Sequence, residues 1–222
     1  MKNLVLFGTG GMAREANQLA EDINEVAPTL NVLGFLDEEE SNHGKKINGL
    51  PVLGGLEWLN SPAANLAFVT VCIGNTVAKR KVVLQIEKNT NAQFLSLIHP
   101  TAWIGNRVRI GDGSIICAGS LITTDIAIGN HVIVNIGSTI NHDATVADYV
   151  TIAPSVKITG AVQVKEGADL GVGSAIVQGI TIGEWSIIGA GAVVINDIDP
   201  NVTAVGAPAK AVKSRPVGWH LG

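Results

Sequence analysis

The chain has 222 residues and a formal net charge of −4 at pH 7, and charged residues make up only 15% of it. A composition with this charge does not predict the basic surface that binds nucleic acids or anionic membranes. We therefore expect no nucleic-acid partner and no membrane insertion. Hydrophobic residues reach 46%, aromatic residues only 4%, and 26 residues are glycine. An aliphatic core with many turns is therefore expected, as in repeat proteins.

The cysteines and the apolar runs indicate the compartment. Cys72 and Cys117 lie in apolar segments without the spacing of a zinc site, so we interpret both as core residues of a protein from a reducing compartment. No apolar run approaches the roughly 18 residues that span a bilayer, and the run at 4–7 is too short for a signal peptide. We expect a cytoplasmic protein without a metal.

The first hundred residues alternate short apolar runs with amphipathic stretches. Strands are predicted at 3–7, 32–36, 66–73 and 94–98, and helices at 12–25 and 78–88. Glycine and proline interrupt the pattern at 51–55. Strands that alternate with helices indicate a parallel sheet, so we expect a small Rossmann-like α/β domain over residues 1–97.

From residue 98 the hydrophobic period changes to six. Every sixth residue from Ile98 to Val194 is Ile, Val or Leu, which makes seventeen consecutive matches. The position four residues after each of the first sixteen is Ala, Ser, Val or Ile, and glycine often follows the aliphatic residue. This pattern is typical of a hexapeptide β-helix, so residues 98–222 are predicted to form an all-β domain with a C-terminal cap.

A hexapeptide solenoid places one repeat on each of three flat faces, so that one coil takes 18 residues. Neighbouring coils hydrogen-bond as parallel strands about 4.8 Å apart, and residues 18 apart in sequence lie one above the other. We expect aliphatic side chains inside the prism and glycines at its corners. The period ends at Asp199-Pro200, and residues 205–210 either cap the last coil or contact a ligand.

Six short motifs connect the two regions to one family. They are Phe7-Gly8-Thr9-Gly10-Gly11, Phe35-Leu36-Asp37-Glu38, Ile73-Gly74-Asn75, Ile98-His99-Pro100, Asn141-His142-Asp143 and Val205-Gly206-Ala207-Pro208-Ala209-Lys210. Together they resemble the bacterial nucleotide-sugar acetyltransferases of the PglD and NeuD type, over nearly the whole chain. The resemblance implies a left-handed β-helix, acetyl-CoA as cosubstrate, a nucleotide-linked amino sugar as acceptor, and a homotrimer with active sites between adjacent prisms.

His142 and Asp143 follow Ile140 near a predicted corner. An imidazole beside a carboxylate is the pairing of a general base, although a solvated histidine at a turn fits the same pattern. Gly160 lies one coil after His142. Because it has no side chain, its N–H is accessible to an oxyanion; alternatively, the glycine only forms a corner of the prism. The resemblance implies that His142 and Asp143 are catalytic, and we interpret Gly160 as the oxyanion donor.

The resemblance also implies contacts with the acetyl donor. It assigns Thr151, Val172 and Ala190 to acetyl-CoA, the last two being one coil apart. Many relatives have a histidine at position 151, so the threonine is a departure from the family pattern. Gly206 and Lys210 are candidates for the adenine and phosphate groups of CoA.

The segment from Gly8 to Ala13 follows a strand, begins a helix and satisfies the GxGxxA pattern of dinucleotide sites. A helix N-terminus favours a phosphate-bearing ligand. NAD binding with Asp37, and glycines that serve packing alone, are alternatives. The resemblance instead assigns a nucleotide sugar to Gly10, Gly11, Met12, Asp37, Glu38 and Gly74, and we add Asn135 as a candidate from the prism. Methionine at position 12 replaces a histidine that is frequent in relatives.

The expected reaction is direct attack of a sugar amine on the thioester, without a covalent enzyme intermediate. The expected acceptor is a 4-amino-4,6-dideoxy sugar linked to UDP, dTDP or GDP, for surface glycan synthesis. O-acetylation of the sialic acid type is the alternative, because a hydroxyl needs the same base. A γ-carbonic anhydrase site needs three converging histidines, and His131 and His142 have no third one nearby. A scaffold or ice-binding prism needs a regular polar ladder, which the sequence lacks.

Overall fold

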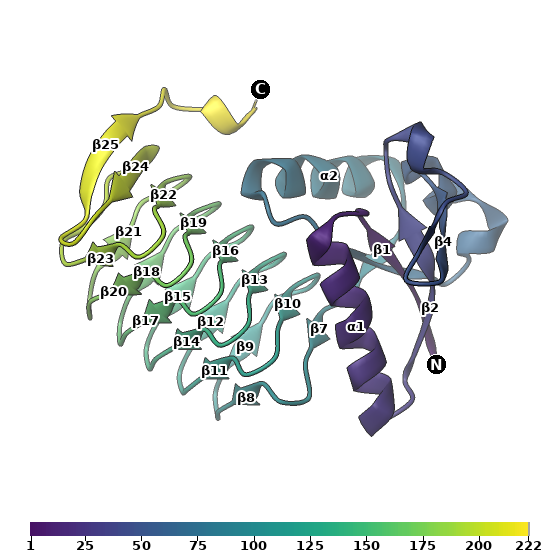
Figure 1. Cartoon of the computed structure of the whole chain (residues 1–222), viewed down its shortest axis with the longest axis horizontal. Helices are drawn as coiled ribbons and strands as arrows, with labels where there is room; N and C mark the ends of the chain where they lie inside the picture. The colour runs from purple at the N-terminus through teal and green to yellow at the C-terminus, as the bar shows by residue number, and fades with distance from the viewer. Residues whose placement is uncertain (222) are drawn as a thin grey trace.

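The computed structural model describes residues 1–221 and shows an α/β part followed by a long prism of stacked coils (Figure 1). The α/β part contains a six-stranded sheet in the order β3-β4-β2-β1-β5-β6. Its strands are β1 (Lys2–Phe7), β2 (Leu30–Leu36), β3 (Lys46–Ile47), β4 (Leu50–Gly54), β5 (Phe68–Val71) and β6 (Gln93–Phe94). Its helices are α1 (Gly11–Val26) and α2 (Thr76–Asn89). The pair β3–β4 is antiparallel, and the other pairs are parallel.

Both faces of the central strand β1 are buried because the two helices cover opposite sides. Leu4 and Leu6 pack in one cluster with apolar residues of α1, and Val5 and Phe7 pack in a second cluster with apolar residues of α2. Alternate residues of a strand point to opposite faces, so this division follows directly from the sequence. The expected Rossmann-like parallel sheet is confirmed.

Two sequence-based assignments in this part are wrong. The strand expected at 94–98 is two strands, because β6 pairs with β5 whereas β7 (Leu97–Ile98) pairs with β10 of the prism. The Gly/Pro-rich stretch at 51–55 contains β4, which lies beside β2. Pro51 is only the second residue of β4, and such a position near the start of a strand tolerates proline.

The prism consists of three flat parallel sheets whose strands are two residues long. The first sheet contains β7, β10 (Ile115–Ile116), β13 (Ile133–Val134), β16 (Thr151–Ile152), β19 (Asp169–Leu170) and β22 (Ile187–Ile188). The second contains β8 (Trp103–Ile104), β11 (Leu121–Ile122), β14 (Thr139–Ile140), β17 (Lys157–Ile158), β20 (Ala175–Ile176) and β23 (Val193–Val194). The third contains β9 (Arg109–Ile110), β12 (Ala127–Ile128), β15 (Thr145–Val146), β18 (Gln163–Val164) and β21 (Thr181–Ile182).

The strand registers repeat every 18 residues without a shift, as Leu121 opposite Thr139 and Thr139 opposite Lys157 illustrate. The aliphatic residues of the six-residue pattern fill the interior. This confirms the left-handed hexapeptide β-helix. The residue that turns each corner is the third one after the aliphatic residue, as at Asp125 and Asp143, where φ is 58° and 62°. Glycine occupies several of these positions, such as Gly113, Gly119 and Gly137, as expected, whereas the glycines directly after the aliphatic residues do not supply the positive φ.

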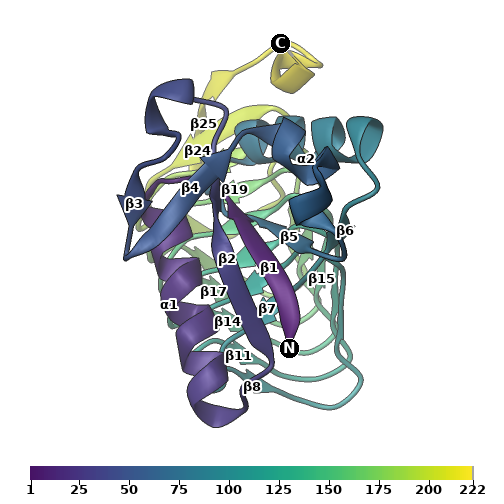
Figure 2. The ribbon, with the colours of Figure 1, turned by 90° about the vertical axis from the view of Figure 1, so that its right-hand side faces the viewer.

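A β-hairpin closes the far end of the prism. It consists of β24 (Val202–Val205), which pairs with β22, and β25 (Lys210–Ser214). Val202 and Ala204 are buried in the prism core, so the hairpin caps the last coil. At the other end, Leu97, Ile115 and Ile133 on the outer face of the first sheet join the cluster that contains α1. Figure 2 shows the N-terminal sheet in front, with the prism behind it.

Candidate active site

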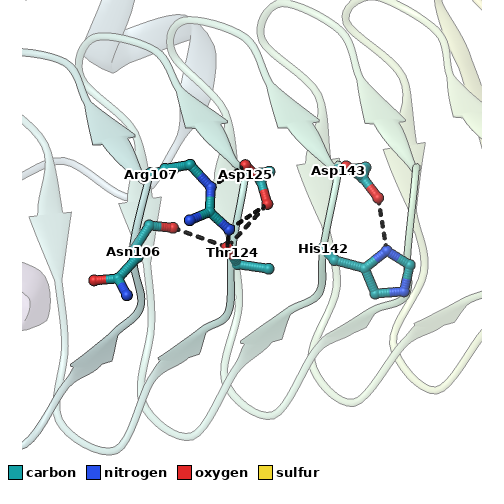
Figure 3. A network of polar contacts seen from close by, with 6 residues as sticks. All are labelled: Asn106, Arg107, Thr124, Asp125, His142 and Asp143. Carbon is teal, nitrogen blue, oxygen red and sulfur yellow. Dashed lines mark hydrogen bonds and ion pairs between the residues drawn. The ribbon is translucent and has the colours of Figure 1, made fainter.

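His142 and Asp143 form an exposed hydrogen-bonded pair at the corner between β14 and β15 (Figure 3). The distance from His142 Nδ1 to Asp143 Oδ2 is 2.8 Å. Adjacent residues of a straight strand point to opposite sides, but the positive φ of Asp143 turns its carboxylate to the ring. Aspartate tolerates this conformation better than most residues. Nε2 of His142 has no hydrogen-bond partner within residues 1–221, so it is open as a proton acceptor.

Gly160 lies against the imidazole of His142 from the next coil. A Cβ atom at position 160 would lie 2.4 Å from Cε1 and 2.7 Å from Nε2, which is closer than real contacts allow. The Gly160 carbonyl accepts a hydrogen bond from Gly179 N at 3.0 Å, whereas the Gly160 N–H has no backbone acceptor in the described part of the chain. The N–H of Thr124, at the same position two coils earlier, also lacks a backbone acceptor among the described residues, and Gly160 is buried, so its role as an oxyanion donor stays a prediction.

One coil before His142, Thr124 and Asp125 occupy the same two corner positions. Arg107 donates to both carboxylate oxygens of Asp125, from Nε at 2.5 Å and from Nη2 at 3.1 Å, and Nη2 also donates to Thr124 Oγ1 at 2.9 Å (Figure 3). These hydrogen bonds hold the pKa of Asp125 below its usual value. Arg107 therefore neutralises Asp125, while Asp143 faces His142. The 18-residue spacing of Arg107, Asp125 and Asp143 was available in the sequence, but we had not drawn this ladder from it.

Val172 and Ala190, which are predicted to contact acetyl-CoA, lie at a different corner of the prism from His142. Both are exposed one coil apart, where the sheet of β19 and β22 turns into the sheet of β20 and β23. Asn135 lies at the same corner, and its Oδ1 accepts a hydrogen bond from Ile136 N at 2.8 Å. His142 lies at the next corner. A single chain therefore does not bring these residues to His142.

Gly206 and Lys210 lie at the far end of the prism. Both are exposed; Gly206 begins the turn that connects β24 to β25, and Lys210 is the first residue of β25. Gly206 has φ of 95°, a conformation that favours glycine. The structure places both residues beyond the last coil and far along the prism from the His142 corner.

Thr151 is buried between the prism and the α/β part, so its hydroxyl does not lie on the prism surface. Its Oγ1 accepts a hydrogen bond from Lys79 Nζ at 2.9 Å and donates to the Gly74 carbonyl at 2.8 Å. Only 8% of its surface is exposed. The donor and one of the two acceptor positions of its hydroxyl are thus used within the chain, and its contact with acetyl-CoA stays a prediction.

The glycines assigned to the nucleotide sugar meet at one edge of the α/β sheet. Gly10 precedes α1 and Gly74 follows β5, and the parallel neighbours β1 and β5 end at the same edge. No atom lies within 4 Å of a Cβ built on Gly10 or on Gly74, so this edge has open space. The first turn of α1 carries no acidic residue, and no side chain caps it. Its N–H groups are therefore available to an anion such as a phosphate.

Asp37 is the hydrogen-bonding centre of this edge. Its carboxylate accepts from Thr9 Oγ1, from Glu39 N at 2.9 Å and from Asn42 Nδ2 at 3.3 Å. His43 Nε2 lies 2.7 Å from the Asp37 carbonyl oxygen. Thr9, Asn42 and His43 were not among the predicted site residues, although the position of Thr9 between two glycines of the turn was a signal.

Two other predicted residues at this edge are already engaged. Glu38 is exposed, and its Oε1 accepts a hydrogen bond from Leu56 N at 2.9 Å, which leaves its second oxygen without a hydrogen bond in residues 1–221. Met12 is half-buried and packs against the cluster that contains α1. The side chain of Met12 therefore contributes to packing.

Comparisons with known proteins agree with this geometry. Residues 3–86 match the family model of the PglD N-terminal domain. WeeI from Acinetobacter baumannii is 33% identical, with 94% of this chain and 99% of that chain covered and a TM-score of 0.85. Perosamine N-acetyltransferase from Caulobacter crescentus, solved as a histidine-to-asparagine mutant with CoA and GDP-perosamine, is 30% identical, with 96% and 97% covered and a TM-score of 0.85. No curated protein matches the chain significantly.

A third similar structure is the acetyltransferase domain of PglB from Neisseria gonorrhoeae, which is 28% identical, with 96% of this chain and 100% of that chain covered and a TM-score of 0.86. The hexapeptide prism and these matches place the chain in the class of hexapeptide acyltransferases. The chain belongs to the PglD/NeuD-like family of sugar acetyltransferases within that class.

None of the helices in residues 1–221 is long and apolar enough to cross a membrane. The same residues contain no group of three or more His, Cys, Asp or Glu side chains that could hold a metal ion.

Proposed function

We propose that this enzyme transfers an acetyl group from acetyl-CoA to the amine of a nucleotide-linked 4-amino-4,6-dideoxy sugar, with His142 as the general base. The observation that carries the proposal is the His142 pair, in which Asp143 orients the ring and Nε2 stays open. The relative from Caulobacter crescentus, which was solved with CoA and GDP-perosamine, supports an amine as the acceptor. Both substrates are metabolites of the cytoplasm, where we place the reaction.

In this reaction the neutral amine nitrogen attacks the carbonyl carbon of the thioester. Nε2 of His142 takes the proton that the nitrogen loses, and Asp143 stabilises the resulting imidazolium. The N–H of Gly160 donates to the negative charge that develops on the carbonyl oxygen. When the C–S bond breaks, the imidazolium returns the proton to the departing sulfur, so the products are an amide and CoA.

We assign the two parts of the chain different tasks. Residues 1–97 would bind the acceptor, with its diphosphate at the N-terminus of α1 beside Gly10 and Gly11, and with Asp37 and Glu38 near the nucleoside. Both carboxylates accept hydrogen bonds from the N–H and O–H donors of a base or a ribose. Residues 98–222 would bind acetyl-CoA and carry the catalytic pair.

We also propose that the active enzyme is a homotrimer. His142 and Val172 lie at different corners of one prism, so an adjacent prism would bring Val172 and Ala190 to His142. The flat sheet between these corners exposes Trp103 by 57% and Leu121 by 46%, which suits burial against a second copy. Gly206 and Lys210 would then lie along the same groove, toward the adenosine end of CoA. A monomeric mass for the active protein would exclude this arrangement.

The decisive experiment measures CoA release from acetyl-CoA with UDP-, dTDP- and GDP-linked 4-amino sugars, and with a sialic acid as the hydroxyl control. Turnover of an amino sugar that is lost in His142→Ala supports the reaction and its base. Full turnover by His142→Ala rejects His142 as the base. Turnover of the hydroxyl acceptor alone replaces N-acetylation by O-acetylation.

A further inference from the structure

Lys79 is a lysine with no exposed surface. It is the fourth residue of α2, and its Nζ reaches across to the prism, where it donates to the Val150 carbonyl at 3.2 Å and to Thr151 Oγ1 at 2.9 Å. Burial lowers the pKa of Lys79 to about 7. Other buried positions of α2, such as Val83 and Ile86, carry the aliphatic side chains that ordinary core packing uses. A buried amine is costly unless hydrogen bonds hold it, so a specific role is indicated.

Thr151 extends this contact to the edge of the α/β sheet. Its hydroxyl donates to the Gly74 carbonyl at 2.8 Å. Asn75, the next residue, caps α2 by accepting a hydrogen bond from Ala78 N at 2.9 Å. Gly74 is thus held by the cap of α2 on one side and by the prism on the other. Lys79 and Gly74 are the two ends of one hydrogen-bond chain that passes through Thr151.

Two titratable groups of the prism face Lys79. The charge of Asp169, which lies one coil beyond Thr151, raises the pKa of Lys79, and the charge of Lys79 lowers the pKa of His131. Asp169 is half-buried, and its carboxylate makes no hydrogen bond to the described residues. Both hydrogen-bond acceptors of Lys79 Nζ among the described residues, Val150 and Thr151, belong to the prism.

We propose that Lys79 is a positioning residue for the acceptor, which fixes the Gly74 loop on the prism through Thr151. The inference rests on the proposed function, because it takes Gly74 as part of the acceptor site. The acceptor is held by the α/β part, whereas the chemistry takes place on the prism. A displacement of about 1 Å between the two would cost about a hundredfold in rate. Lys79 touches no reacting atom in this scheme.

The test compares Lys79→Met, Thr151→Val and the double variant with the wild type. Methionine keeps the length of lysine without its donors, and valine keeps the shape of threonine without its hydroxyl. We expect each single variant to raise the acceptor KM and lower kcat by about tenfold or more, with the KM for acetyl-CoA within about twofold. The double variant should be no worse than Lys79→Met, because both changes break one chain. Lys81→Met, on the exposed face of α2, is the matched control and should behave as the wild type.

Amide hydrogen exchange gives a readout that needs no substrate. Amides 73–78 should exchange faster in both single variants, while amides 139–146 around His142 keep their wild-type rates. Unchanged exchange at 73–78, effects that multiply in the double variant, or equal losses for both substrates would overturn the proposal. If Lys79→Met does not fold, Thr151→Val gives the same exchange and KM tests. If the wild type acetylates no amino sugar, the proposed function fails, while the exchange result still judges the role of Lys79.

Discussion

Gly160 and His142 are in contact across two neighbouring coils, and the contact leaves no room for a side chain at position 160. A Cβ atom there would come within 3.0 Å of three ring atoms of His142. The imidazole therefore packs against Gly160 of the next coil, and Asp143 holds the ring by its hydrogen bond to Nδ1. This relationship explains why a glycine occupies this place in the column above Thr124.

The first prediction concerns Gly160→Ala. The added methyl group would push the ring of His142 away from its position without removing the backbone N–H or the imidazole. We expect kcat to fall by about a hundredfold, the contribution of a well-placed general base. Steady-state CoA release measures this effect, and the thermal unfolding midpoint serves as the control because the displaced side chain, His142, is exposed. Activity within twofold of the wild type would show that the ring position does not matter.

The second prediction concerns the charge beside the imidazole. Asp143→Asn keeps the backbone conformation that asparagine also tolerates, but it removes the carboxylate that stabilises the imidazolium. We expect kcat to fall by about ten- to a hundredfold. Asp125→Asn is the matched control, since it changes the same corner position one coil earlier and alters only exposed contacts with Arg107 and Thr124. Equal losses in the two variants would contradict a special role for Asp143.

A third prediction tests the acceptor site. No atom lies within 4 Å of a Cβ on Gly10 or Gly74, so alanine at either position fits the free protein. If a nucleotide sugar approaches this edge closely, the methyl group enters its space and raises the acceptor KM by about tenfold. The KM for acetyl-CoA and the unfolding midpoint should not change. An unaltered acceptor KM in both variants would move the nucleotide away from these glycines.

The fourth prediction is a pH dependence of stability that comes from His131. This side chain is 3% exposed and stacks on Tyr149, and burial lowers its pKa from 6.5 to about 4. The folded protein then binds fewer protons than the unfolded chain between these values, so stability falls as the pH drops through 6.5. From pH 7 to pH 5 we expect His131 to account for roughly 2 kcal/mol of lost stability.

Urea unfolding at the two pH values checks this, with His131→Asn as the comparison. Asparagine suits the positive φ of 55° at this position and does not titrate. The variant should lose less stability than the wild type between pH 7 and pH 5, whatever its absolute stability. Equal losses in the two proteins would show that His131 does not titrate as its burial requires.

The architecture was predictable from the sequence because it depends on a repeated pattern. Seventeen aliphatic positions at a spacing of six specify the prism and its 18-residue coil, and hence the stacking of Gly160 above His142. The continuous apolar run at 4–7 in β1 likewise indicates a strand covered on both sides. These features follow from hydrophobic periodicity, which many residues report together.

Other features depend on single residues and could not be predicted in this way. The carboxylate of Asp143 reaches the ring only because its φ is positive, which spacing does not reveal. The position of Thr151 in the sequence predicts a contact with acetyl-CoA. The packing of α2 against the prism, however, places Lys79 Nζ within hydrogen-bond distance of its hydroxyl. The strand expected at 94–98 divides because its two ends pair with different sheets. The first case depends on a local backbone conformation, and the other two depend on contacts between residues far apart in sequence.

The unbroken register of the prism also restricts how its gene can change in length. One added residue between β7 and β23 would turn every later residue toward a wrong face and would separate His142 from Gly160 if it fell between them. A block of 18 residues, in contrast, would insert a whole coil and move the C-terminal hairpin by about 4.8 Å along the axis. A change of length that keeps every strand of the prism in register without a protruding loop is therefore a whole coil.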